Sequence, residues 1–177
     1  MKTLLYLIRH GATEANLARP PVLQGRSHNP PLAPLGIRQA EATRDFLAIR
    51  PIEYCYCSPL RRALETATIV AGPHGIGPIP LEALTDCYPD GEVLAEVAQR
   101  AHTALEELFS RHAGKAILVV GHDGANQTYL AALLGLTPDQ PRRLRLDNCG
   151  ISVVVREGEK TTVNTLNAAF HLQGIAA

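Results

Sequence analysis

The chain has 177 residues, of which 46% are hydrophobic, and it carries 17 basic and 17 acidic residues. A chain of this length and composition fits one domain spanning residues 1–177, with enough apolar side chains for a sizeable core. The balanced charge gives no global field that would favour nucleic acid or an anionic membrane. The basic cluster of Arg142, Arg143 and Arg145 is expected to be a solvated surface.

Targeting segments and membrane spans are not expected. The apolar run at residues 4–8 ends at Arg9 and is too short for a signal peptide, and no stretch reaches membrane-spanning length. The four cysteines, at positions 55, 57, 87 and 149, lack metal-binding spacing and are interpreted as reduced thiols. These features predict a cytoplasmic protein.

Apolar runs alternate with helical patterns along the chain. Strands are predicted at residues 3–8, 52–57 and 115–121, and helices at 35–49, 59–72, 92–112 and 123–136. Residues 150–157 and 160–167 are predicted to form two antiparallel strands joined across Gly158. Such alternation predicts an α/β fold, a three-layer sandwich with a mostly parallel central sheet and helices on both faces.

Two of the predicted strands lead into a histidine beside a glycine. Residues 3–8 are followed by Arg9, His10 and Gly11, and residues 115–121 are followed by His122. Ligands bind at the carboxyl ends of strands in open parallel sheets, so both histidines are expected in one crevice. Either histidine alone could be an ordinary strand-end residue, but matching positions on two strands favour a site.

The strand at residues 52–57 is expected to bring cationic side chains to the same edge. It is followed by Ser58 and then by Arg61 and Arg62 in the first helical turns. Arginine suits bidentate binding of a phosphate group. Arginines and histidines converging without a matching acidic cluster predict an oxyanion pocket. A metal site is disfavoured because the arginines would repel a cation.

The segment LIRHGATEAN, at residues 7–16, resembles the signature of the histidine phosphatase superfamily, which includes phosphoglycerate mutases and acid phosphatases. Similar segments follow in the family's order over nearly the whole chain: GRSHNPPLAPLGIRQA, CSPLRRALETA, VVGHDG and LNAAFHL. The resemblance implies that His10 is the nucleophile and forms a phosphohistidine. It further implies that Arg9, Arg62 (rather than Arg61) and His122 bind the phosphoryl oxygens with help from Asn16, and it implies no cofactor.

The resemblance also implies a carboxylic acid that protonates the leaving oxygen, in a segment reading roughly Leu-x-Glu. Asp86 keeps that spacing and Glu82 is its competitor, with another group or water as the remaining alternative. Larger members have a long segment after this acid. Here residues 87–91 are the only ones between Asp86 and Glu92, which predicts a short lid over the site.

The expected function is a metal-independent phosphomonoesterase acting on a small phosphorylated metabolite. The alternatives are a phosphoglycerate mutase, which would use the same pocket, and a non-catalytic phosphate-binding module. No nucleic-acid or membrane partner is expected, and the sequence indicates neither the substrate nor the oligomeric state. His102 and His112 are expected on the solvated face of the helix at residues 92–112.

Overall fold

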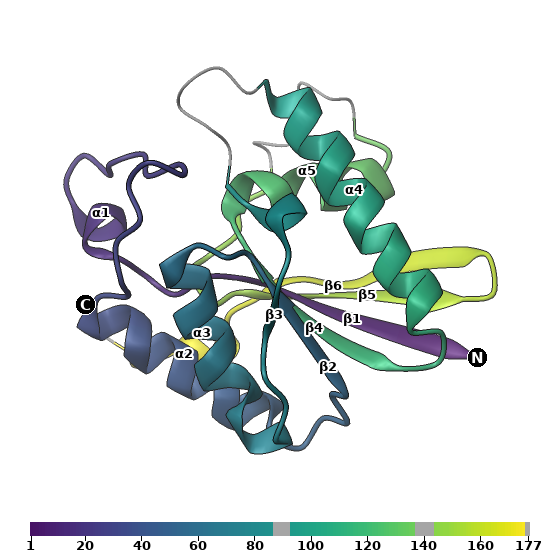
Figure 1. The fold of residues 1–177 in the computed structure, drawn as a ribbon. Coiled ribbons are helices and arrows are strands. Elements are labelled where there is room, and N and C mark those ends of the chain that lie inside the picture. The colour runs from purple at the N-terminus through teal and green to yellow at the C-terminus, as the bar shows by residue number, and fades with distance from the viewer. Residues whose placement is uncertain (87–92, 137–143, 176–177) are drawn as a thin grey trace.

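The computed structural model describes residues 1–86, 93–136 and 144–175. Within these residues six strands form one sheet in the order β3-β2-β4-β1-β5-β6 (Figure 1). The parallel strands are β1 (Lys2–Arg9), β2 (Tyr54–Cys57), β3 (Ile79–Pro80) and β4 (Ala116–Gly121). β5 (Ile151–Glu157) runs antiparallel to β1, and β6 (Lys160–Ala168) runs antiparallel to β5.

Helices cover both faces of this sheet. The helices of the described residues are α1 (Glu14–Leu17), α2 (Pro34–Leu47), α3 (Arg61–Ala71), α4 (Leu94–Arg111) and α5 (Asp123–Leu133). Short 3₁₀ turns are η1 (Gly72–His74), η2 (Glu82–Leu84) and η4 (Phe170–Leu172). Figure 1 shows α2 and α3 on one side of the sheet and α4 and α5 on the other. The predicted α/β sandwich with a mostly parallel central sheet is confirmed.

The central strand β1 is buried on both faces. Tyr6 and Ile8 pack in the cluster that includes side chains of α2 and α3. Leu5 and Leu7 pack in the cluster formed with α4 and α5. Successive side chains of a strand point to opposite faces, so a strand covered on both sides needs an unbroken apolar run. The run at the start of the sequence therefore reflects the central place of β1.

Some sequence expectations differ from the structure. Helix α3 begins at Arg61, with Leu60 as its N-cap residue, so Pro59 lies before the helix rather than in its first turn. His112 is not on a solvated face: it is buried, its Nε2 lies 2.8 Å from the Tyr56 hydroxyl, and its ring stacks on Tyr54. His112 is the C-cap residue of α4, where the chain leaves the helix and the helical period no longer sets the side-chain direction.

The remaining expectations concern thiols, membrane spans and a few segments that are not described. Cys55, Cys57 and Cys149 are buried free thiols. No helix among the described residues is both long enough and apolar enough to cross a membrane. Cys87, the predicted lid at residues 87–91, and Arg142 and Arg143 lie outside the described residues.

Candidate active site

The carboxyl ends of β1, β2 and β4 meet at one edge of the sheet. In the parallel register, Arg9 of β1 lies beside Gly121 of β4. The His10 N–H donates to the Gly121 carbonyl at 3.0 Å, which places His10 and His122 just beyond two paired strands. Ser58 follows β2, and its N–H donates to the Val120 carbonyl at 3.0 Å. The strand ends therefore hold both predicted histidines at the same edge.

The imidazole of His10 is held in one tautomer. Its Nδ1 lies 2.7 Å from the Gly11 carbonyl oxygen, and Arg62 Nε donates to its Nε2 at 3.3 Å. A carbonyl only accepts and a guanidinium only donates, so the hydrogen is on Nδ1 and the lone pair is on Nε2. Burial holds the pKa of His10 well below its usual range, and the charges of Arg62 and Arg9 act in the same direction. The ring is therefore a neutral imidazole near pH 7, with Nε2 available as a nucleophile.

Arg62 is the buried cation beside the His10 ring. Besides its bond to His10, its Nη2 donates to the Gly25 carbonyl at 3.0 Å and to Asp86 Oδ2 at 2.8 Å. Its side chain is fully buried, whereas Arg61 points to the surface and pairs with Glu65. The structure therefore places Arg62, and not Arg61, next to His10.

His122 and Arg9 each present a buried nitrogen that no described residue satisfies. His122 Nε2 lies 2.8 Å from Ser58 Oγ, while its Nδ1 makes no hydrogen bond within the described chain. Arg9 Nη1 donates to the Leu146 carbonyl at 2.6 Å, while its Nε has no described acceptor. An anionic oxygen is the acceptor that suits the Arg9 Nε–H, and it suits His122 Nδ1 in the tautomer that carries its hydrogen there.

Burial also holds the pKa of His122 well below its usual range, and the nearby charges of Arg62, Arg9 and Arg100 act in the same direction. The two imidazole rings lie with their centroids 5.1 Å apart. Because both rings are uncharged in the folded protein, they do not repel each other. The positive charge of the pocket therefore comes from its arginines.

The carboxylate at the site is Asp86. Its Oδ2 lies 2.8 Å from Arg62 Nη2 and 3.5 Å from His122 Nδ1. Glu82, the competing candidate, has a side chain that is 74% exposed and forms an ion pair with Arg26. A single carboxylate oxygen of Asp86 therefore lies against both Arg62 and His122.

Asn16 lies at the start of α1 and takes part in a capping box with Thr13. Its Oδ1 accepts hydrogen bonds from the N–H and the hydroxyl of Thr13, each at 3.0 Å. Among the described contacts, none joins Asn16 to His10, Arg62 or His122. Its role as a phosphate ligand stays a prediction.

Three further residues support the site. Ser58 contacts His122, and Asn148 Nδ2 donates to the His10 carbonyl at 2.8 Å. Arg100 of α4 donates to carbonyl oxygens of the segment that carries Asp86. Ser58 was already expected at this edge, because it directly follows a predicted strand. Nothing local marks Arg100 or Asn148, because their contacts arise only when distant segments pack together.

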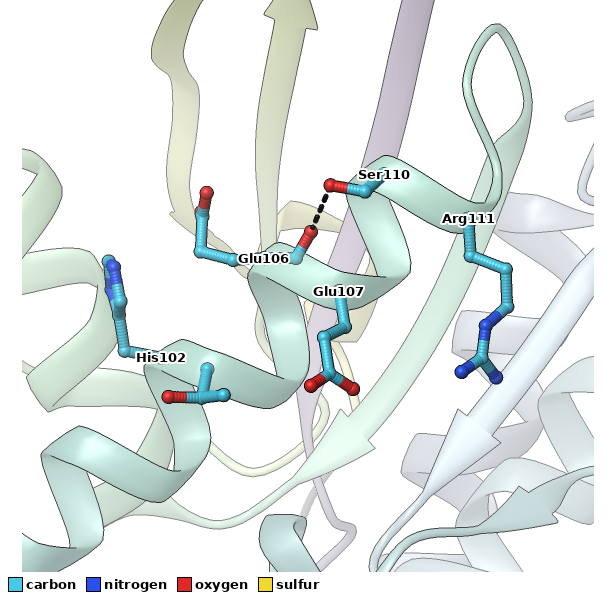
Figure 2. Close-up of a pocket in the computed structure, with 6 residues that line it drawn as sticks. His102, Glu106, Glu107, Ser110 and Arg111 are labelled. Atoms are coloured by element: carbon cyan, nitrogen blue, oxygen red, sulfur yellow. Dashed lines mark hydrogen bonds between the residues drawn. The ribbon is translucent and has the colours of Figure 1, made fainter.

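A second feature lies away from these strand ends. Along α4, a hollow of about 650 Å³ is lined by His102, Thr103, Glu106, Glu107, Ser110 and Arg111 (Figure 2). Its Glu106 is already bound by Arg156, with both distances 2.7 Å, and by the Tyr129 hydroxyl at 3.1 Å. The described residues contain no group of three or more His, Cys, Asp or Glu side chains that could hold a metal ion.

The order of the motifs and the geometry at the strand ends agree with a comparison against known families. A family model described as the histidine phosphatase superfamily (branch 1) matches residues 5–88 and 85–169. The chain belongs to the histidine phosphatase superfamily. The resemblance drawn from the sequence motifs is thereby confirmed.

Individual members of this superfamily are similar over most of the chain. A probable phosphoglycerate mutase GpmB of Yersinia pestis (strain Pestoides F) is 32% identical over 182 residues, covering 85% of this chain and 83% of the relative. The structure of Bacillus stearothermophilus YhfR has a TM-score of 0.89 at 25% identity, covering 97% of this chain and 100% of that chain. Phosphoserine phosphatase from Entamoeba histolytica, in complex with 3-phosphoglyceric acid, has a TM-score of 0.87 at 25% identity, covering 96% and 99%.

Proposed function

We propose that residues 1–177 act as one histidine phosphatase domain, a metal-independent phosphomonoesterase for a small phosphorylated metabolite. The observation that carries the proposal is the tautomer of His10. Its unprotonated Nε2 lies against a buried guanidinium at 3.3 Å, with the Asp86 carboxylate bound to the same guanidinium. Nucleophile, oxyanion-binding cation and acid–base group are thus within one pocket.

In the first step, His10 Nε2 attacks phosphorus. The N–P bond forms as the bond between phosphorus and the leaving oxygen breaks. Arg9, Arg62 and His122 stabilise the negative charge on the phosphoryl oxygens, which is most of what a protein contributes to phosphoryl transfer. Asp86, in its carboxylic acid form, gives its proton to the leaving oxygen.

In the second step, water attacks the phosphohistidine. The Asp86 carboxylate accepts a proton from the water, an O–P bond forms, and the N–P bond breaks. Inorganic phosphate leaves, and His10 returns to the neutral tautomer with the lone pair on Nε2. The arginines supply the charge that a divalent ion provides in metal-dependent phosphatases, so no step requires a metal.

The short connection between Asp86 and helix α4 favours hydrolysis over the mutase reaction. A mutase has to keep water from its phosphohistidine while the acceptor reorients. Only residues 87–93 separate Asp86 from the first residue of α4, so the sequence lacks the long segment that larger members have there. The similar proteins include both a phosphatase and a probable mutase, so this connection is the feature that favours one reaction.

Phosphorus NMR of one reaction mixture tests the proposal. With 3-phosphoglycerate, 2,3-bisphosphoglycerate and EDTA present, free phosphate should form faster than 2-phosphoglycerate. Isomerisation that outpaces phosphate release would instead make the protein a mutase.

Loss of activity in EDTA with recovery on adding a divalent ion would contradict the metal-independent mechanism. Phosphate binding without turnover of any ester, including p-nitrophenyl phosphate, would indicate a non-catalytic module.

A further inference from the structure

Asp86 is held in the site by its side chain and, separately, by its main chain. The carboxylate contacts Arg62 at 2.8 Å and lies 3.5 Å from His122. Both partners are proposed ligands of the phosphoryl group, so a bound substrate competes with the carboxylate for them. Contacts made by the side chain therefore cannot keep the acid in place during the reaction.

The main chain is held by Arg100 of α4. Its Nη1 donates to the carbonyl oxygens of Ala83 at 2.8 Å and Thr85 at 2.7 Å, and its Nη2 donates to the Asp86 carbonyl at 3.2 Å. Leu84 of the same segment is buried in the core cluster that contains α4 side chains. A planar guanidinium presents its donors in a fixed fork, so these bonds orient the whole turn.

We propose that Arg100 is a positioning residue that fixes the main chain of residues 83–86 and so keeps the Asp86 carboxyl group within reach of the leaving oxygen while the phosphoryl group occupies Arg62. This inference rests on the proposed function, because it takes Asp86 as the general acid. The main-chain bonds to Arg100 involve no phosphoryl ligand, so substrate does not displace them.

Substrates with different leaving groups distinguish a positioning role of Arg100 from a purely structural one. An alkoxide needs a proton as it departs, whereas p-nitrophenolate scarcely does. Loosening the Asp86 segment should therefore slow the hydrolysis of an alkyl phosphate and leave p-nitrophenyl phosphate almost unaffected. A change that only weakened the fold would slow both reactions to the same extent.

The experiment compares Arg100→Ala, Asp86→Asn and the double variant on 2-glycerophosphate and p-nitrophenyl phosphate. Arg100→Ala should lower kcat on 2-glycerophosphate by about 10-fold to 100-fold, the range expected for a small misplacement of a catalytic group. The double variant should be no slower than Asp86→Asn, because both changes act through one carboxyl group. Arg100→Lys should retain part of the rate on 2-glycerophosphate. Arg111→Ala, an exposed arginine of the same helix, should match the wild type.

The outcomes distinguish the positioning role of Arg100 from the acid role of Asp86. Equal losses on the two substrates in Arg100→Ala, or losses that add in the double variant, would overturn the inference. If circular dichroism shows Arg100→Ala to be unfolded, Arg100→Lys and its double variant with Asp86→Asn provide the same comparison. A selective loss in Asp86→Asn without one in the Arg100 variants would reject only the role of Arg100. Equal losses in Asp86→Asn itself would reject the acid of the proposed function.

Discussion

The tautomer of His10 follows from two neighbours, one of which can only accept a hydrogen bond and the other only donate one. Gly11 offers a carbonyl oxygen to Nδ1, and Arg62 offers an N–H to Nε2. The hydrogen bond to Gly11 fixes the ring orientation, while burial and the surrounding charges keep the ring uncharged. As the proposed nucleophile, His10 therefore has a free lone pair before any substrate arrives and needs no separate base to remove a proton.

Replacing His10 with alanine should lower kcat/KM for p-nitrophenyl phosphate by at least about 10³-fold, because only direct attack by water would remain. Steady-state assays measure the loss, and mass spectrometry of samples quenched in alkali, where phosphohistidine is stable, should show phosphoenzyme in the wild type and none in His10→Ala. His102→Ala, a histidine of α4 away from the strand ends, serves as the control. A His10→Ala variant that keeps more than about a tenth of the wild-type rate would contradict the phosphohistidine mechanism. Such a variant would have lost less than ~1.4 kcal/mol of transition-state stabilisation.

Several site residues could be predicted because each lies close to the end of an apolar strand. Arg9 is the last residue of β1, His10 and His122 directly follow β1 and β4, and the family motif selected Arg62 in the first turn of α3. The choice between Asp86 and Glu82 could not be decided in this way. It depends on the 3₁₀ turn η2, which leaves Glu82 exposed while Asp86, two residues past the turn, reaches Arg62.

Helix α2 positions the turn that follows β1. The Ala33 N–H donates to the Ala12 carbonyl at 2.9 Å, and the Ala12 N–H donates to Gln39 Oε1 at 2.9 Å. A Cβ atom on Gly36 would lie 2.0 Å from the Ala12 carbonyl oxygen. A Cβ atom on Gly11 would lie 2.6 Å from the Gly36 carbonyl oxygen. The first turn of α2 thus lies directly against the backbone next to His10.

Gly36→Ala should therefore destabilise the protein, although alanine is the better helix former. Intrinsic propensity would favour alanine by up to about 1 kcal/mol, but overpacking against a fixed backbone typically costs about 1–3 kcal/mol or more. Urea denaturation should show a lower free energy of unfolding. Gly124→Ala in α5, where an added Cβ meets no atom within 4 Å, is the matched control and should be neutral or slightly stabilising. Equal effects of the two substitutions would mean that α2 does not press on the turn.

Elements buried on both faces were the easiest to predict, because a continuous apolar run leaves few alternatives. β1 and β4 follow their predicted ranges closely. The starts of helices were less well predicted. Helix α3 has no side-chain cap hydrogen bond, so its N-terminus carries no capping signal in the sequence. Its start at Arg61 depends on how the chain leaves β2.

Uncharged histidines in the core link the stability of the whole molecule to pH. Burial holds the pKa values of His10 and His122 well below the ordinary value of 6.5. Below that pH the unfolded chain takes up protons at these positions and the folded chain does not. Protonation therefore favours the unfolded state, and stability is lost as the pH falls below 6.5.

The free energy of unfolding should decrease from pH 6.5 to pH 5 by up to about 1.4 kcal/mol per pH unit for each of His10 and His122. Urea titrations in a buffer free of phosphate measure the slope. His10→Ala should have a shallower slope by roughly the contribution of one histidine. If wild type and His10→Ala share one slope over this range, His10 does not carry the pH dependence.

The layered architecture could be predicted from the alternation of strands and helices, whereas the order of strands in the sheet could not. Periodicity reports which faces of an element are buried and says nothing of which strand lies beside it. β1 lies between β4 and β5, and β2 lies between β3 and β4. Local signals do not encode these neighbours, because they are chosen by packing across the whole chain.

The central position of β1 has a consequence for synthesis. Its residue Leu4 pairs with Ala116 of β4 and Val155 of β5, so both neighbours are translated long after β1 itself. At about 5–20 residues per second, β1 remains without either partner for roughly 6–20 s. During that time both edges of this apolar strand are unpaired, and unpaired strand edges are templates for pairing with other chains. His10 and His122 can meet only after β4 has been made. A ribosome-bound fragment that stops short of residue 116 therefore contains His10 but lacks β4 and His122.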